Sequence, residues 1–249
     1  MSLSITDKAY NRLVIPFLEK LDNGNFFKNT ITLLLSVSAV GLLLGGIYLS
    51  IDGLIGEFGF VELYILRESL SDAKRAGAAA GLLPGFALSI IAAWASFSVL
   101  KKRTEQIKTV EYDGLVSFVY VKLTPKLILV VGELCFVLVL YTGILQIIAT
   151  LVGSYVYAPL AAYPKELLRI VPGMDLFSGL APRQIQGSYD NFGVSFLAGL
   201  VDVVASFFLL ISFYLYKEVY DYILKLTTNL LAFLPKFAIP LAIKKREEN

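Results

Sequence analysis

The stretch LILVVGELCFVLVLYTGILQIIATLVGSYVYAPLAAYP, residues 127–164, decides the fold class of this chain. It is bounded by Lys126 and Lys165, and Glu133 is its only charged residue. A helix needs about 20 predominantly apolar residues to cross the hydrocarbon core of a bilayer. Because lipid offers the backbone no hydrogen-bond partner, an apolar run of this length has to be helical. The stretch therefore predicts a transmembrane helix, for which we expect the bounds 126–156.

Three further runs predict three more transmembrane helices. Residues 29–51 and 76–100 carry no charge, and residues 191–216 carry only Asp202. The composition agrees, because 57% of the 249 residues are hydrophobic and 17% are charged, whereas about 25% are charged in a soluble domain. We therefore expect an all-α integral membrane protein, a single membrane domain with four transmembrane helices.

The distribution of basic residues predicts the orientation of these helices. With four spans, 16 of the 22 lysine and arginine residues fall on the side that holds both termini, and 6 fall on the other side. Because cytoplasmic loops are enriched in Lys and Arg, we expect both termini in the cytoplasm. The membrane is then a plasma membrane or a bacterial inner membrane.

The segments outside the spans predict smaller features. Residues 1–27 place apolar side chains at helical spacing, which predicts an amphipathic helix at the membrane interface. Asp113-Gly114 lies between β-branched and aromatic residues, which indicates a small cytoplasmic β-hairpin; an amphipathic run is the alternative. The apolar outer loop 157–190 is expected to lie on the membrane surface, cap the bundle or dock onto another protein.

The fourth helix is expected to continue into the cytoplasm. Residues 217–249 are interpreted as a cytoplasmic helical extension followed by an interfacial tail. Within it, the apolar segment 226–243 contains Pro235 and Pro240, and each proline removes a backbone donor. We expect this segment to be interfacial or re-entrant, with a fifth span as the alternative.

Small residues four positions apart indicate where the helices pack, because they let two backbones approach closely. They are Gly41 and Gly45 in the first span, Gly77, Gly81 and Gly85 in the second, and Ser195 and Gly199 in the fourth. The simplest arrangement is a tight hairpin between the first two spans, and an oligomer interface is the alternative. The first pair lies near the middle of its span and Gly77 lies at the outer end of the second. We therefore expect the outer part of the second helix to face a different element.

Two carboxylates inside the spans are the candidate functional residues. A charge at the bilayer centre costs about 2.5–3.5 kcal/mol. Glu133 is close enough to the inner interface to reach it, whereas Asp202 lies near the midplane. The apolar runs 29–51, 76–100 and 191–216 contain no Lys, Arg or His, and the third span has only Lys126, at its inner boundary. Asp202 is therefore expected to be neutral, to pair with an ion or residue from outside the chain, or to accept hydrogen bonds from water or from third-span groups such as Tyr141, Thr142 or Gln146.

The amino-acid inventory excludes much chemistry. The chain has no histidine and one cysteine, Cys135, which excludes the usual zinc sites, histidine-ligated haem or copper, Ser-His-Asp triads and an internal disulfide. We expect no enzymatic activity, no cofactor and no bound metal. The basic loops follow from topology, so we expect no nucleic-acid partner. The expected partners are membrane lipids and other membrane subunits.

The sequence therefore favours a non-catalytic subunit or scaffold of a larger membrane protein complex. The alternative is a small oligomeric ion-coupled transporter or channel that uses Asp202, with Glu133 as a second carboxylate.

Overall fold

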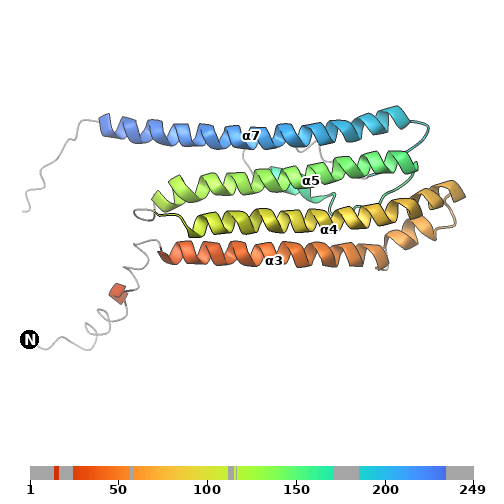
Figure 1. Cartoon of the computed structure of the whole chain (residues 1–249), viewed down its shortest axis with the longest axis horizontal. Helices are drawn as coiled ribbons and strands as arrows, with labels where there is room; N and C mark the ends of the chain where they lie inside the picture. The colour runs from red at the N-terminus through yellow and green to blue at the C-terminus, as the bar shows by residue number, and fades with distance from the viewer. Residues whose placement is uncertain are drawn as a thin grey trace, which may run out of the picture.

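Four long helices run side by side along the length of the molecule (Figure 1). The computed structural model describes residues 14–16, 25–56, 59–111, 115, 117–170 and 185–233. The long helices are α3 (Asn25–Ile55), α4 (Asp72–Lys108), α5 (Thr124–Val152) and α7 (Phe192–Phe233). Shorter elements are the π-helices η2 (Val61–Ile65) and η3 (Ser117–Leu123) and the helix α6 (Tyr163–Ile170). The predicted all-helical fold, with four helices long and apolar enough to span a membrane, is confirmed.

Three of the long helices extend beyond the predicted spans, whereas α5 ends at Val152, before the predicted end at residue 156, because Gly153 in a left-handed conformation terminates it. α4 has 37 residues, which is about 55 Å of helix at 1.5 Å per residue. A bilayer measures about 40–45 Å with its headgroup regions, so charged residues at the helix ends can remain in polar surroundings. α7 likewise continues as a helix to Phe233, well past residue 216. The second half of the segment 226–243 lies outside the described residues.

The helices form a row in chain order rather than a closed bundle. α4 packs against α3 on one side and α5 on the other, and α7 packs against α5 (Figure 1). Two buried apolar clusters hold these seams. One contains Ala39, Leu100, Val130 and Leu134, and the other contains Cys135, Val139, Leu209 and Phe213. Because the helices alternate in direction, the start of α3 and the end of α7 lie at the same end of the row.

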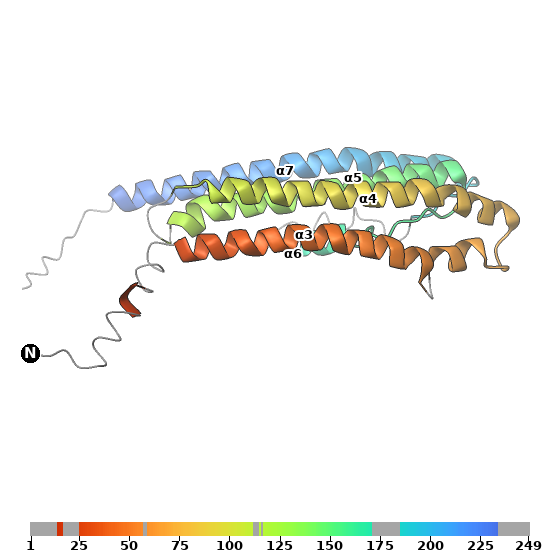
Figure 2. The same cartoon turned by 60° about the horizontal axis from the view of Figure 1, so that its bottom comes forward.

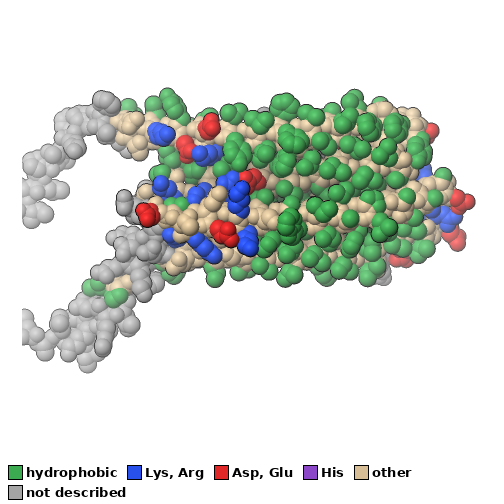
Figure 3. Space-filling model, viewed as in Figure 1, with side chains coloured by type: hydrophobic (Ala, Val, Ile, Leu, Met, Phe, Trp, Pro, Cys, Tyr) green, Lys and Arg blue, Asp and Glu red, His purple; other side chains and the backbone are tan. Residues whose placement is uncertain are grey.

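Charged side chains concentrate at that same end, which we call the basic end. Figure 3 shows lysine and arginine side chains gathered there, beside a long surface that is almost entirely hydrophobic. The basic end carries Lys101, Lys102, Lys108, Lys122, Lys126 and Lys217. Its position next to an apolar belt is typical of a membrane protein whose charged end lies at the headgroup level.

The prediction of a β-hairpin around Asp113-Gly114 is wrong for its second half, residues 117–123, which the structure describes. Residues 117–123 form the π-helix η3, and none of the described residues belongs to a strand. Phe118 and Leu123 are buried against Ile107 of α4. A helix buries these side chains and forms its backbone hydrogen bonds within the segment. A lone hairpin leaves the backbone donors and acceptors on its two outer edges without partners. Asp113-Gly114 lies outside the described residues, as does most of the predicted amphipathic helix 1–27.

The outer loop is not a surface loop, because much of it folds back along the row. Residues 152–157 run down the small-residue face of α4. α6 then packs against α5, at about mid-length of the row (Figure 2). Leu167 of α6 packs with the buried clusters around Leu134 and Cys135. We call residues 152–170 the re-entrant segment, because they turn back from the end of α5 and lie along the row.

Candidate functional site

Asp202 lies at a close approach of α5 and α7. A Cβ added at Gly199 would be 2.7 Å from Ile147 Cγ1 and 3.0 Å from the Gly143 carbonyl oxygen. A Cβ added at Gly143 would be 3.0 Å from the Cβ of Asp202. The two glycines therefore allow a backbone contact that brings Asp202 against α5. The partner of Gly199 is thus Gly143, which the small-residue pattern did not single out. Ser195 lies one turn before this contact and is half-buried.

The Asp202 carboxylate has no hydrogen-bond or ion-pair partner among the described residues. The three expected donors are engaged elsewhere. The Tyr141 hydroxyl is 2.8 Å from the Ser89 hydroxyl, and the Thr142 hydroxyl donates to the Val139 carbonyl at 2.8 Å. The Gln146 side-chain amide donates to the Gln186 carbonyl at 3.0 Å. The expectation that the third span supplies a donor to Asp202 is therefore wrong for these three side chains.

Glu133 forms an ion pair that the sequence reasoning missed. Arg103 Nε donates to Glu133 Oε2 at 3.0 Å, and a second guanidinium nitrogen pairs with Oε1. The Tyr214 hydroxyl also donates to Oε1, at 3.1 Å. The side chains of Arg103 and Glu133 are only 10% and 16% exposed. This cluster of Arg103, Glu133 and Tyr214 links α4, α5 and α7 near the basic end.

The position of Arg103 explains why the pair was missed. The second span was expected to end at residue 100, but α4 continues to Lys108 as a helix. Arg103 lies one turn past the expected end and turns toward α5. Its long side chain can therefore place the guanidinium against a carboxylate that lies inside the third span.

The two candidate carboxylates lie far apart. Asp202 lies beside Gly143, and Gly143 is ten residues from Glu133 along α5. At 1.5 Å per residue this separation is about 15 Å. Glu133 is satisfied by a buried arginine, whereas Asp202 has no described partner. The structure therefore leaves Asp202 as the single unmatched acidic group among the described residues inside the row.

The glycines of the first span do not pack as expected. No described atom lies within 4 Å of a Cβ added at Gly41 or Gly45. The close approach to α4 is made instead by Gly46, where an added Cβ would be 2.6 Å from Ala93 Cβ. Gly41 and Gly45 line an apolar cavity of about 300 Å³, whose other walls are α4, α5 and α6. The first two helices do pack against each other, but the contact uses Gly46 rather than the predicted pair Gly41 and Gly45.

The glycines of the second span pack against the loop that follows α5 rather than against a helix. An added Cβ at Gly77 would be 2.5 Å from the Val152 carbonyl oxygen, and one at Gly81 would be 2.9 Å from that of Tyr155. At Gly85 it would meet the carbonyl group of Tyr157. These three glycines are one turn apart on one face of α4, and that face accommodates the backbone that enters the row.

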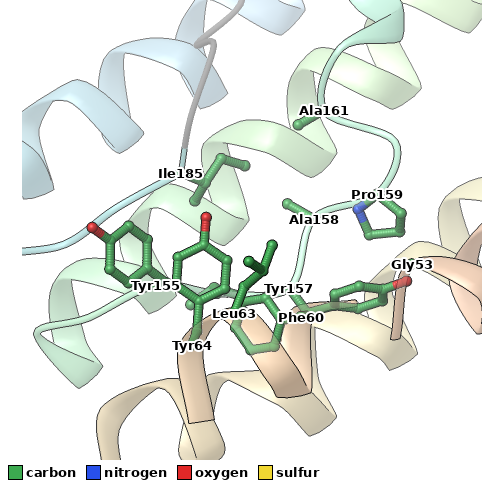
Figure 4. Close-up of a pocket in the computed structure, with 11 residues that line it drawn as sticks. Gly53, Phe60, Leu63, Tyr64, Tyr155, Tyr157, Ala158, Pro159, Ala161 and Ile185 are labelled. Atoms are coloured by element: carbon green, nitrogen blue, oxygen red, sulfur yellow. The ribbon is translucent and has the colours of Figure 1, made fainter. Parts of the chain in front are cut away.

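An aromatic cavity of about 240 Å³ lies where this segment enters, at the end of the row opposite the basic end. Figure 4 shows the rings of Phe60, Tyr64 and Tyr155 gathered near Ile185, with Tyr157 reaching toward Gly53. The Tyr64 and Tyr155 ring centroids are 4.3 Å apart, and those of Phe60 and Tyr157 are 5.5 Å apart. These contacts join the end of α3, η2 and the re-entrant segment.

Tyr157 fixes that junction through its hydroxyl. The hydroxyl donates to the Ser50 carbonyl of α3 at 2.6 Å. Burial, with a further contribution from the charge of Asp52, raises the pKa of Tyr157 to about 12. The hydroxyl therefore keeps its proton, and its hydrogen bond, throughout the physiological pH range. Sequence reasoning treated this residue only as a marker of the membrane interface.

Neither a metal site nor a known relative provides a function for the chain. Within the described ranges, no group of three His, Cys, Asp or Glu side chains could hold a metal ion. No protein-family model matches this chain, and neither a curated protein nor a solved structure is similar to it.

Proposed function

We propose that this chain is a non-catalytic membrane subunit that binds another membrane protein through the Asp202 face of α7. The observation that carries the proposal is the Asp202 carboxylate, which is half-buried against α5 and has no described partner. An acidic group at this depth is costly in lipid. A basic or hydrogen-bonding group from a neighbouring chain would remove that cost.

The surroundings of Asp202 support this proposal. α7 packs on α5 along one side, and its other side is apolar and exposed. The exposed side chains include Val194, Leu197, Val201, Val204, Phe208, Ile211 and Leu215. Lipid alone satisfies such side chains, but it offers nothing to a carboxylate. Asp202 lies at the α5 contact, half-buried beside this exposed side, and it is therefore the position of α7 at which we infer a protein partner.

Purification from native membranes in mild detergent tests the proposal. We expect a second membrane protein to co-purify with the wild-type chain and to be lost from Asp202→Leu. Asp202→Asn keeps hydrogen-bonding atoms and should retain part of the association. Val201→Leu changes the adjacent exposed residue without altering polarity and serves as the matched control. A monomer in every preparation, or an association that Asp202→Leu leaves intact, would refute the proposal.

Ion-coupled transport is the second candidate, and the same unmatched carboxylate favours it. A carboxylate that can gain and lose a proton inside the row could carry an ion across part of the membrane. Glu133 is removed from such a pathway by its pairing with Arg103. Proton or sodium flux into proteoliposomes should then depend on Asp202 alone. Equal flux for the wild type and Asp202→Asn, or none in either, would eliminate this candidate.

We further propose that the basic end lies in the cytoplasm, which places both termini there. The excess of lysine and arginine at this end supports that orientation. The single native cysteine, Cys135, is buried and gives a low labelling background. A Lys102→Cys variant should be labelled only from the cytoplasm, and Arg67→Cys only from the outside. The reverse pattern would invert the topology.

A further inference from the structure

A groove between α3 and α4 runs from the hydrophobic surface to the basic end. It has a volume of about 230 Å³. Ser36, Ala39 and Val40 of α3 and Phe97, Lys101, Thr104, Glu105 and Lys108 of α4 line it. It shares no lining residue with the cavity beside α6. The groove is thus a separate feature of the α3–α4 seam.

The lining of the groove changes from apolar to basic along its length. Val40 and Phe97 form the inner part, and Lys101 and Lys108 form the part nearest the basic end. Lys101 and Lys108 are seven residues apart, which spans about 10 Å of helix. This order matches a phospholipid, in which a charged phosphate is joined to apolar chains that reach deeper into the membrane.

The two lysines are available to an anion. Both are exposed, and neither forms an ion pair with any residue that the structure describes. Glu105 also lines the groove, so the three charged side chains leave one net positive charge. The Lys101 ammonium lies 6.0 Å from the centroid of the Phe97 ring. This cation–π distance holds the ammonium at the boundary between the basic and apolar parts.

We propose that the groove binds an anionic phospholipid. Its phosphate lies between Lys101 and Lys108, and one acyl chain lies along Val40 and Phe97. Lysines at a membrane surface attract anionic lipids with about 1 kcal/mol each, which corresponds to about a fivefold preference per lysine. A pair of lysines on an open surface would give only that attraction, whereas the groove also offers an apolar surface to the acyl chain of the lipid. The proposal does not depend on the subunit role assigned to Asp202.

The chain contains its own reporter for this site. Trp94 is the only tryptophan, and its side chain is 62% exposed. It lies seven residues before Lys101 on α4, so two helical turns put both side chains on the same face. A bromine atom on the acyl chain of a bound lipid would therefore approach the indole and quench its fluorescence.

The experiment measures quenching of Trp94 in vesicles of phosphatidylcholine that contain brominated phosphatidylglycerol. Brominated phosphatidylcholine in the same proportion gives the reference for lipid without preference. We expect the wild type to be quenched more strongly by the brominated anionic lipid. The preference should fall about fivefold in Lys101→Gln and disappear in the double variant Lys101→Gln/Lys108→Gln. A double variant that keeps the wild-type preference would overturn the proposal.

Two further variants separate the groove from general surface charge. Lys102→Gln removes the same charge from an exposed neighbour that does not line the groove, and it should keep the preference. An equal fall in Lys102→Gln would mean that charge density alone attracts the lipid, which contradicts the site. Val40→Phe fills the apolar part without changing charge and should also reduce the preference. If Val40→Phe kept the wild-type preference for the anionic lipid, the acyl chain would not lie in the groove.

Discussion

Removing Arg103 is expected to destabilise the protein strongly, because it leaves Glu133 charged and nearly buried. Arg103 supplies two of the three hydrogen bonds that Glu133 accepts, and Tyr214 supplies the third. The two side chains are 10% and 16% exposed. Breaking such a pair by removing one partner typically costs 3–5 kcal/mol. We therefore expect Arg103→Met to lower the free energy of unfolding by about 3–5 kcal/mol.

The double variant gives the sharper measurement. Arg103→Met/Glu133→Leu removes both charges and leaves two apolar side chains of similar size, so it should recover most of the lost stability. Tyr214→Phe leaves the guanidinium in place and should cost only about 1 kcal/mol, as one hydrogen bond does. Denaturant unfolding of the purified protein in detergent, followed by far-UV circular dichroism, measures all three variants.

The exposed pair Lys217–Asp221 is the matched control for the buried one. Its nitrogen–oxygen distance is 2.7 Å, but its side chains are 32% and 31% exposed. An exposed pair four residues apart on a helix is worth about 0.3–0.5 kcal/mol. Lys217→Met should therefore be nearly neutral. The reasoning is refuted if Arg103→Met and Lys217→Met have equal effects. It is also refuted if the loss in Arg103→Met and the loss in a single variant Glu133→Leu simply add in the double variant.

Three further predictions concern the glycines and Tyr157. Gly46→Ala places a methyl group 2.6 Å from the Cβ of Ala93, so it should lower the free energy of unfolding by about 1–3 kcal/mol in the same assay. Gly41→Ala and Gly45→Ala meet no neighbour and should leave that free energy unchanged. Equal losses in all three variants would contradict the helix contacts. Gly199→Ala should likewise cost about 1–3 kcal/mol by separating α5 from α7, seen as a lower unfolding midpoint. Folding raises the Tyr157 pKa from about 10 to about 12, so its contribution to stability is complete below pH 10 and is lost as the pH rises through 12. The stability difference between wild type and Tyr157→Phe should therefore be constant up to pH 10 and shrink above it.

The four membrane helices were predictable because the bilayer imposes a local rule. A long apolar run has to satisfy its own backbone, so composition and length fix both its helical state and its span. The same rule does not say which face of a helix meets which neighbour. Each of Gly41, Gly45 and Gly46 could allow a close approach of another helix. Only the packed structure shows that Gly46 contacts Ala93 of α4 while Gly41 and Gly45 line a cavity.

The candidate site was predicted in part. Asp202 and Glu133 were identified because any carboxylate inside an apolar run is expensive. Their different surroundings were not predictable. Arg103 lies outside the apolar run, and its pairing with Glu133 depends on how far α4 extends and how its side chain turns. The aromatic cavity joins segments about a hundred residues apart, so no local pattern could reveal it.

The re-entrant segment shows where tertiary structure overrides the local signal. Residues 157–190 hold many apolar side chains, but four prolines and six charged residues interrupt them, so no apolar run is long enough to cross the membrane as a helix. A surface position, a cap and a docking role were all compatible with that sequence. Residues 152–157 lie against α4 because Gly77, Gly81 and Gly85 leave room there for their backbone. This contact joins two segments about 75 residues apart, so no local pattern predicts it.

The sequence by itself therefore determined the class of the protein, its four apolar helices, the charge bias between their ends and the two carboxylates inside them. These features depend on burial of each segment in lipid, which acts on one segment at a time. The tertiary structure alone decided that Arg103 satisfies Glu133, that α6 enters the row, and that Asp202 is left without a described partner. Those outcomes depend on contacts between segments that are far apart in the sequence. Asp202 lacks a described partner because the nearby donors of α5 are bound to other groups, and only the packed structure shows where those donors are bound.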